Sequence, residues 1–286
     1  MSEGEAASRV GSGGAEPRVD TPRIDISVAH PARRYDYWLG GKDNFAADRE
    51  SGDAVAAAFP TIRTAIVENR RFLRRAVTHL ARDFGVRQFL DIGTGIPTSP
   101  NTHQVAQSFA PDARIVYVDN DPIVLAHARA LLTGTQEGAT AYIDADLRDP
   151  DGIIAHPELR RTIDLSRPVG LMLVAILHFI ADSDDPRGIV AHLVGALPSG
   201  SYVALTHGTA DHMSAEESGV VTNASNGNVA VDLHLRTRRQ FTDFLTGLDI
   251  VEPGVVPLAE WRADGEEQPR PSKEDVSMWG AVARVP

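Results

Sequence analysis

The chain contains 286 residues, of which 42% are hydrophobic and 23% are charged, and this composition suits one large domain with an extension, or at most two small domains. It contains no cysteine, which excludes disulfides, thiolate metal sites and a cysteine nucleophile. The net charge is −11, divided into +2 over residues 1–90 and −13 over residues 91–286, which disfavours a nucleic acid as partner. The same acidity favours a cationic or neutral small-molecule partner, unless it serves solubility alone.

Two features predict a cytoplasmic protein without a membrane span. The longest apolar run, residues 169–180, is about a dozen residues long, well short of the roughly 20 that cross a bilayer. The amino terminus is polar and carries no apolar signal core. Residues 1–27 are rich in Gly, Ser, Ala, Pro and Glu, so we expect them to form a disordered tail.

Residues 28–85 are predicted to form a helical extension or lid. Pro31 suits the first turn of a helix, and apolar residues recur at three- and four-residue steps over residues 61–84. We expect these helices to pack on a main domain formed by residues 86–286.

In the main domain, short apolar runs alternate with helical segments. The expected strands are residues 88–92, 113–119, 140–143, 169–177 and 201–206, and the expected helices between them are residues 102–109, 122–132 and 186–197. This alternation predicts a parallel α/β sheet with helices on both faces. Over the last third we expect a helix at residues 237–248 and strands at residues 250–257 and 276–284, which close the sheet with an antiparallel edge.

The strongest local signal is the run Asp91-Ile92-Gly93-Thr94-Gly95, directly after the first strand. Glycines at these two positions let the backbone turn sharply and lie against a ligand. By itself the run has an alternative interpretation as a simple turn. Asp119 ends the next strand 28 residues after Asp91, where a carboxylate can accept both hydroxyls of an adenosine ribose.

The residues after Gly95 discriminate between adenosine ligands. Pro97 and Pro100 delay the next helix and remove amide donors where a pyrophosphate would bind, so a dinucleotide such as NAD fits poorly. Asp146, after the third strand, offers a carboxylate to an adenine amino group, or else is a solvated loop acid. These residues favour S-adenosylmethionine over NAD, although an NAD-dependent oxidoreductase remains the alternative for Asp119.

With its Asp91–Gly95 run, the acidic end of its second strand and Asp146-Leu147 after its third, the sequence resembles the class I S-adenosylmethionine-dependent methyltransferases. More narrowly, the runs at residues 32–45, 91–98 and 116–122 are similar to the actinobacterial S-adenosyl methyltransferase family, formerly DUF574. The resemblance extends from about residue 25 to the carboxyl end. It implies a Rossmann-like, mostly parallel seven-stranded sheet with helices on both faces, and bound S-adenosylmethionine, but no particular substrate.

Carried over position by position, the family pattern assigns most of the cofactor contacts. Gly93 and Gly95 fall under the methionine part, Asp119 on the ribose, and Asn120 beside the adenine. The full set of cofactor contacts expected in the main domain is Asp91, Gly93, Thr94, Gly95, Asp119, Asn120, Asp146, Leu147 and Ala175.

Two further assignments lie outside this set. In the extension, Tyr37, Lys42 or Asn44 is expected to reach the cofactor carboxylate or to close over the substrate, or else to serve only as packing. At the end of the fourth strand, His178 is the candidate base, since imidazole titrates near neutrality. The similar histidine of small-molecule O-methyltransferases is not the base, which weakens this assignment. His207 is a second candidate of the same kind.

We therefore predict a methyltransferase that acts on a small molecule, with O-methylation favoured because no AsnProProTyr-like run follows the fourth strand. The alternative is a non-catalytic protein that senses S-adenosylmethionine or its demethylated product. No cluster with metal-ligand spacing is visible, and a homodimer is among the assemblies we consider.

Overall fold

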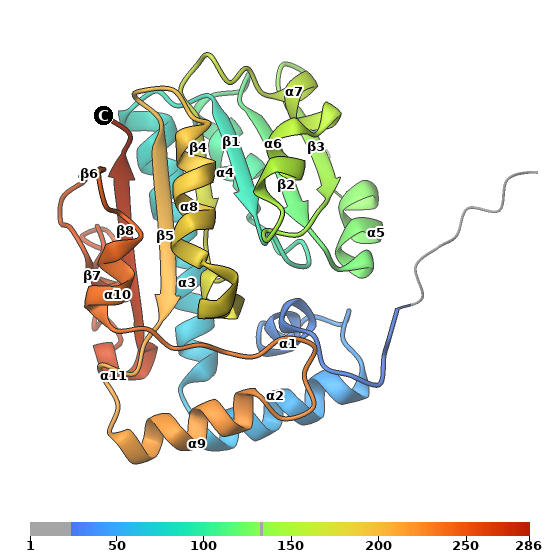
Figure 1. Ribbon diagram of the computed structural model, residues 1–286, viewed down its shortest axis with the longest axis vertical. Coiled ribbons are helices and arrows are strands. Elements are labelled where there is room, and N and C mark those ends of the chain that lie inside the picture. The colour runs from blue at the N-terminus through green and yellow to red at the C-terminus, as the bar shows by residue number, and fades with distance from the viewer. Residues whose placement is uncertain (1–23, 132–133) are drawn as a thin grey trace, which may run out of the picture.

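An eight-stranded sheet forms the centre of the protein (Figure 1). The computed structural model describes residues 24–131 and 134–286, so most of the tail predicted at residues 1–27 lies outside the described residues. The strands are β1 (Gln88–Ile92), β2 (Arg114–Asp119), β3 (Ala139–Asp144), β4 (Gly170–Leu173), β5 (Tyr202–Gly208), β6 (Asp249–Ile250), β7 (Val256–Pro257) and β8 (Met278–Arg284).

The strand order is β3-β2-β1-β4-β5-β8-β6, with β7 also paired to β8. The first five strands are parallel, whereas β8 runs antiparallel to β5, β6 and β7. This confirms the α/β class, but the predicted count of seven strands was one too low. The expected strand at residues 250–257 is split into β6 and β7, because a turn in which Gly254 N donates to Val251 O interrupts it.

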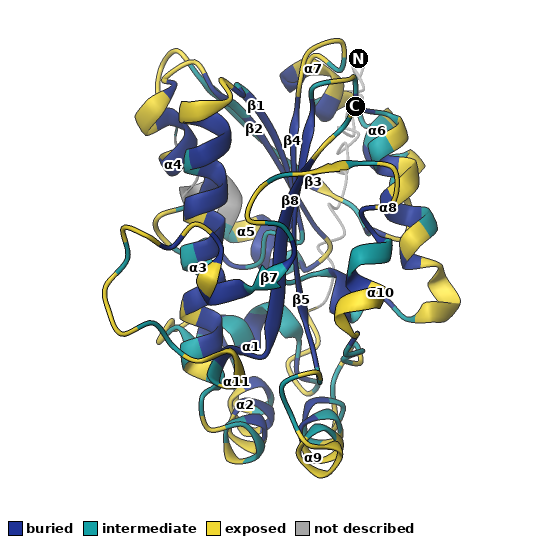
Figure 2. Cartoon of the chain, turned by 90° about the vertical axis from the view of Figure 1, so that its left-hand side faces the viewer, coloured by how far each residue is buried: buried dark blue, intermediate teal, exposed yellow. Residues whose placement is uncertain are grey.

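Helices cover both faces of the sheet, as the alternation predicted (Figure 2). The α-helices are α1 (Pro31–Trp38), α2 (Ala46–Ala58), α3 (Ile62–Thr78), α4 (Thr102–Phe109), α5 (Pro122–Leu131), α6 (Pro150–Ala155), α7 (Pro157–Thr162), α8 (Pro186–Gly195), α9 (Ala215–Ser225), α10 (Arg238–Asp243) and α11 (Lys273–Val276). The short helices are η1 (His79–Asp83), η2 (Leu177–Phe179), η3 (Asp182–Asp184) and η4 (Leu258–Glu260). None of the helices in the described part of the chain combines the length and the apolarity that crossing a bilayer requires.

Alternation along β1 divides the core between the two faces. Phe89 packs with the residues of α3 and α4, whereas Leu90 and Ile92 belong to the cluster that includes α8 and α10. Asp91 therefore points to the same face as Phe89, where Thr102 of α4 donates to it. The two-residue period thus selects α4 as the partner of this carboxylate, which is buried because helices cover both faces of the sheet.

The extension packs across the carboxyl ends of the strands. α2 packs along α9, which belongs to the segment between β5 and β8, and α1 and α3 pack against α2 in turn (Figure 1). A parallel bridge joins Ala29 to Val229, and Arg34 donates to the backbone oxygen of Ser225. The sequence interpretation did not predict α9, although Ser214 and Glu217 form a capping box at its start.

Candidate functional site

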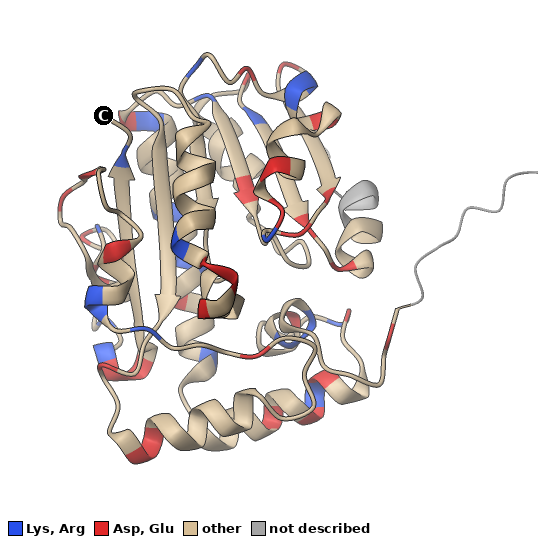
Figure 3. Ribbon diagram, viewed as in Figure 1, with Lys and Arg blue, Asp and Glu red and all other residues tan. Residues whose placement is uncertain are grey.

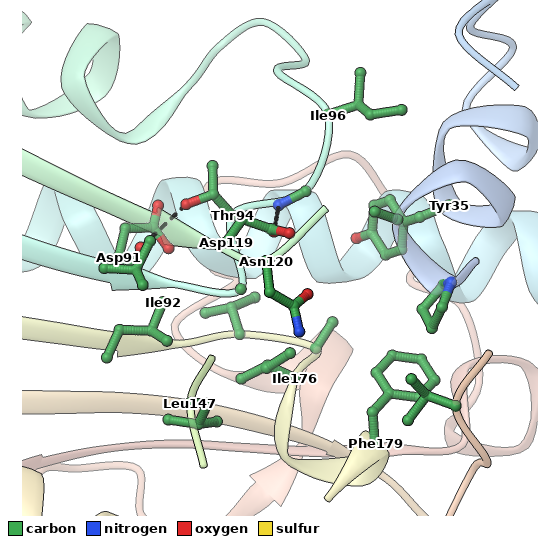
Figure 4. A pocket seen from close by; sticks show the side chains of 18 of the residues that line it. Tyr35, Asp91, Ile92, Thr94, Ile96, Asp119, Asn120, Leu147, Ile176 and Phe179 are labelled. Carbon is green, nitrogen blue, oxygen red and sulfur yellow. Dashed lines mark hydrogen bonds between the residues drawn. The ribbon is translucent and has the colours of Figure 1, made fainter. Parts of the chain in front are cut away.

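A pocket opens at the carboxyl ends of β1 to β4, where the strand order reverses between β1 and β4. Parallel α/β sheets bind ligands at such a switch point because the loops on either side of it diverge. The loops after all four strands line the pocket, together with α1 and α3 (Figure 4). Acidic residues mark the ends of β1 to β3 (Figure 3).

The glycine turn after β1 is built as the sequence predicted. Gly93 and Gly95 adopt φ values of +75° and +66°, a region that favours glycine. A Cβ on Gly93 would lie 2.7 Å from the side chain of Ile176, so the turn also needs the missing side chain for space. Thr94 closes the turn, because its hydroxyl donates to Asp91 O at 3.0 Å.

Asp119 links this turn to the end of β2. Its Oδ2 accepts a hydrogen bond from Gly95 N at 2.7 Å, and its Oδ1 accepts one from Asp121 N at 3.0 Å (Figure 4). Burial raises the pKa of Asp119 above its ordinary value. The carboxylate is thus fixed in place, and its remaining lone pairs are available to the hydroxyls of a ribose.

Asp91 and Arg70 place opposite charges at one end of the pocket. Thr102 Oγ1 donates to Asp91 Oδ2 at 2.6 Å, and burial raises the pKa of Asp91 to about 6. Arg70, on α3, donates to the backbone oxygens of Thr98 and Pro100 at 2.5 and 2.7 Å, which holds its guanidinium against the glycine loop. An amino acid, which carries one ammonium and one carboxylate, is complementary to this pair.

Sequence reasoning missed Arg70 and its neighbours Asn69 and Tyr35. Asn69 is 1% exposed and donates from Nδ2 to the Tyr35 hydroxyl at 2.9 Å, while its Oδ1 has no partner among the described residues. A buried oxygen of this kind, in the lining of a pocket, suits a ligand donor. The signal was present, because Asn69 interrupts the apolar stripe of the helix.

The opposite end of the pocket is formed by the loops after β2 and β3. Asn120 Nδ2 donates to Asp146 Oδ2 at 3.0 Å, and the buried Leu147 lies beside them. A hydrogen-bonding edge next to an apolar side chain is suited to a planar heteroaromatic ring such as adenine. The pocket therefore brings together every main-domain residue predicted to contact the cofactor.

Ala175 lines the pocket just after the end of β4. β4 ends at Leu173, four residues earlier than the strand predicted at 169–177, because Ala175 adopts a φ of +57° and turns the chain out of the sheet. Thr206 of β5 holds this conformation, since its Oγ1 accepts a hydrogen bond from Ala175 N at 2.8 Å. A non-glycine residue held at positive φ is the kind of strain that marks a functional position.

His178 is buried, and its environment disfavours a base role. Burial lowers its pKa well below the usual value, and the neighbouring His207 and Arg236 lower it further. His178 Nδ1 accepts a hydrogen bond from Gly208 N at 3.4 Å, so the neutral ring carries its proton on Nε2. That nitrogen can donate a hydrogen bond but has no lone pair with which to take a proton.

His207 is part of a buried network. Its Nδ1 donates to Gly208 O at 2.7 Å, and its Nε2 accepts from Arg236 at 3.0 Å. Burial lowers its pKa to about 3, so the ring stays neutral and both of its nitrogens are engaged. This side chain positions the loop after β5.

Tyr37 and Asn44 lie elsewhere in the extension, and neither is among the residues that line the pocket. The Tyr37 hydroxyl donates to Asp53 Oδ1 at 2.7 Å, and Asn44 Nδ2 donates to Asp36 Oδ2 at 2.8 Å. Both bonds join segments of the extension to each other. The structure thus brings Tyr35, two residues before Tyr37, to the position where an extension residue was expected.

A second, mainly apolar cavity adjoins the first. Pro31, Tyr35, Ala175 and Phe179 line both, so the two cavities meet at the strained turn after β4. The second cavity is enclosed by α1, α2, α3 and α9 and by the ends of β5 and β8. Its described lining includes Arg34 but no aspartate or glutamate.

Comparison with known proteins agrees with this geometry. The family model described as S-adenosyl methyltransferase matches residues 17–286. The chain belongs to this family. A DUF574 family protein of Streptomyces avermitilis MA-4680 is similar, with 50% identity, a TM-score of 0.86 and coverage of 92% of this chain and 100% of that one. A Thermobifida fusca YX protein, named as a candidate methyltransferase, shares 39% identity with a TM-score of 0.83, over 94% of this chain and 99% of that one. None of the curated proteins compared with the chain matches it.

As a member of the S-adenosyl methyltransferase family, the protein is an S-adenosylmethionine-dependent methyltransferase with a class I fold. The pocket residues fit that cofactor, because three kinds of group follow one another across it. They are the opposite charges of Asp91 and Arg70, the fixed carboxylate of Asp119, and the hydrogen-bonding edge that lies beside the apolar Leu147. In the described ranges, no group of three or more His, Asp or Glu side chains is close enough together to hold a metal ion.

Proposed function

We propose that this methyltransferase acts on a small molecule and transfers the methyl group to oxygen. The observation that carries the proposal is the apolar cavity that meets the cofactor pocket at Ala175. Helices of the extension close this cavity, so a small acceptor fits it better than a segment of a macromolecule does. A cytoplasmic location belongs to the same proposal.

The residues after β2 and β3 would hold the adenosine of S-adenosylmethionine, and the residues of α3 would hold its methionine part. Asp119 accepts the ribose hydroxyls, and the Asn120 and Asp146 pair meets the adenine edge. Arg70 binds the carboxylate, while Asp91 and Asn69 Oδ1 face the ammonium. Held by these residues, S-adenosylmethionine would present its methyl group near Ala175, which lines both cavities.

Charge supports oxygen over nitrogen as the nucleophile. An amine acceptor that binds as a cation would meet Arg34 in a cavity whose described lining has no acidic side chain to offset its charge. A hydroxyl or an ionised oxygen meets no such penalty. S-adenosylmethionine supplies a methyl group already activated by a positive sulfur, so the chain's own residues mainly orient the two reactants and exclude water.

The test combines cofactor binding with acceptor choice. Calorimetry should show binding of S-adenosylmethionine and S-adenosylhomocysteine, and none of NAD. A panel of phenols and carboxylic acids, each paired with the amine of the same skeleton, is then assayed for S-adenosylhomocysteine release. Turnover confined to the amines would contradict O-methylation, and turnover only with a protein or nucleic acid would contradict a small acceptor.

A further inference from the structure

The second cavity holds a buried cation that contacts the face of the Trp38 ring but makes no ion pair with a carboxylate of the described residues. Arg34 is 2% exposed and lines this cavity from α1. Its guanidinium donates to Ser225 O at 2.9 Å and to Ser51 Oγ at 3.3 Å, and both acceptors are neutral. Its Nε has no hydrogen-bond partner among the described residues.

The carboxylate of Asp48 attracts Arg34 only at longer range. Asp48 accepts hydrogen bonds from the backbone of His30 and Phe45 at 2.9 and 2.8 Å, and its Oδ2 lies 3.8 Å from Arg33. Its close contacts are therefore with these two backbone groups and with Arg33, and none of them is with Arg34. Burial lowers the pKa of Arg34 to about 10, which still leaves the guanidinium charged at neutral pH.

A charged guanidinium in an apolar cavity is costly unless an anion pairs with it. Guanidinium groups bind carboxylates through two parallel hydrogen bonds, a geometry that Nε and a terminal nitrogen can supply together. The rest of the described lining is mainly apolar and aromatic, as with Trp38, Phe59 and Val55, and its polar members, such as His178 and Thr209, carry no negative charge. Such a cavity matches a molecule with one anionic group on an apolar body.

The geometry at His178 also favours an anionic acceptor. Its Nδ1 lone pair is engaged by Gly208 N, so this ring is a poor acceptor for a proton released by the substrate. An acceptor oxygen that is already ionised needs no base. The two observations are independent, because one concerns the anion that Arg34 needs and the other concerns the proton that a neutral acceptor would release.

We propose that the natural acceptor is a small apolar carboxylic acid, which binds as the carboxylate with Arg34 as its counter-ion. This inference rests on the proposed function, because it assumes that the second cavity is the acceptor site. It runs against the expectation drawn from the net charge, since the local charge of the cavity is positive while the chain as a whole is acidic.

Calorimetry on the full chain saturated with S-adenosylhomocysteine tests the proposal. The probes are benzoate, 2-naphthoate, indole-3-acetate and decanoate, each paired with its neutral amide. At least one carboxylate should bind tenfold or more tightly than its amide. Arg34→Gln should abolish this preference, Arg34→Lys should keep part of it, and Arg63→Gln, an exposed arginine of the extension outside the cavity lining, should leave it unchanged.

Equal affinity for every acid and its amide in the wild-type chain would overturn the proposal, whether or not the Arg34→Gln variant folds. So would a carboxylate preference that survives Arg34→Gln. Val55→Phe, which fills the cavity from α2, should weaken the binding of acids and amides alike, and unchanged binding would place the probes elsewhere. Failure of S-adenosylhomocysteine itself to bind would contradict the proposed function instead, so the two failures are distinguishable.

Discussion

The two cavities of this methyltransferase are built in different ways. The cofactor pocket carries charged groups of both signs, and most of its residues lie at the ends of strands or in the loops that follow them, in runs such as 91–95 and 119–120. The second cavity, the proposed acceptor site, is mainly apolar, and its walls come from segments far apart in the chain, as when Arg34 reaches Ser225. The cofactor pocket is thus built from local runs of sequence, whereas the second cavity depends on how the extension packs on α9.

The largest effect should come from replacing Arg33, whose side chain joins α2 of the extension to the loop beside the cofactor pocket. Arg33 is 5% exposed, and its guanidinium lies 3.3 Å from Asp121, next to the cofactor loop, and 3.8 Å from Asp48 of α2. Removing one partner of a buried ion pair costs about 3–5 kcal/mol. Arg33→Ala should lower the free energy of unfolding in urea by that amount and weaken cofactor binding. A loss below about 1 kcal/mol would show that α1 is held by packing alone.

A second variant separates cofactor recognition from the fold. Asp119→Ala removes the fixed carboxylate and its bond to Gly95 N, and charge-assisted hydrogen bonds contribute about 1.5–3 kcal/mol each. We expect the affinity for S-adenosylmethionine to fall on the order of 100-fold by calorimetry. The matched control is Asp144→Ala, because Asp144 pairs with Asp119 in the sheet register but is exposed and outside the pocket lining. Equal losses in both variants would contradict the ribose assignment.

The third variant, Asp91→Asn, should stabilise the fold and weaken cofactor binding. The pKa of Asp91 is about 6 in the folded protein, against an ordinary value of 3.8, because burial disfavours its charge. The folded state therefore binds this proton more tightly, and stability falls as the pH rises from about 4 to about 6. Since one pKa unit corresponds to about 1.4 kcal/mol, the ionised carboxylate costs on the order of 3 kcal/mol at neutral pH.

Asp91→Asn should accordingly raise the free energy of unfolding by about 2 kcal/mol at pH 7 and flatten its pH dependence between pH 4 and 6. The bond from Thr102 can persist, because the amide oxygen still accepts. Binding of S-adenosylmethionine should weaken, because its ammonium loses a counter-charge. Urea unfolding over a pH series measures the first effect and calorimetry the second. A destabilised variant would show that the carboxylate is needed by the fold itself.

The smallest effects are expected at two residues of the extension. Tyr37→Phe and Asn44→Ala alter bonds within the extension, to Asp53 and Asp36, and should change the affinity for S-adenosylmethionine less than about twofold. Tyr35→Phe, which removes the hydroxyl that Asn69 contacts, should have the larger effect in the same calorimetric assay. A larger loss of affinity in Tyr37→Phe than in Tyr35→Phe would mean that the extension rearranges when the cofactor binds.

The sequence was sufficient for the parallel sheet and for bringing the main-domain candidates into one pocket, because those residues are fixed by the strand ends beside them. Their contacts with the cofactor stay a prediction. It failed at helices, where a shift of two positions turns a side chain by about 200°. Tyr37 and Tyr35 therefore lie on different sides of α1, and apolar periodicity alone does not choose between them. Arg34 and Arg70 were missed for a related reason, because their roles depend on segments that lie far away in the chain, such as α9 and the glycine loop.

The most direct test of the account is the structure of the complex with S-adenosylhomocysteine. The account predicts that the ribose hydroxyls lie within hydrogen-bond distance of Asp119 and the amino-acid carboxylate near Arg70. The sulfur should then face Ala175 and the apolar cavity beyond it. A nucleoside bound with its amino-acid end at Asn120 and Asp146, or a sulfur turned away from Ala175, would contradict the claim that the two cavities meet where the methyl group is transferred.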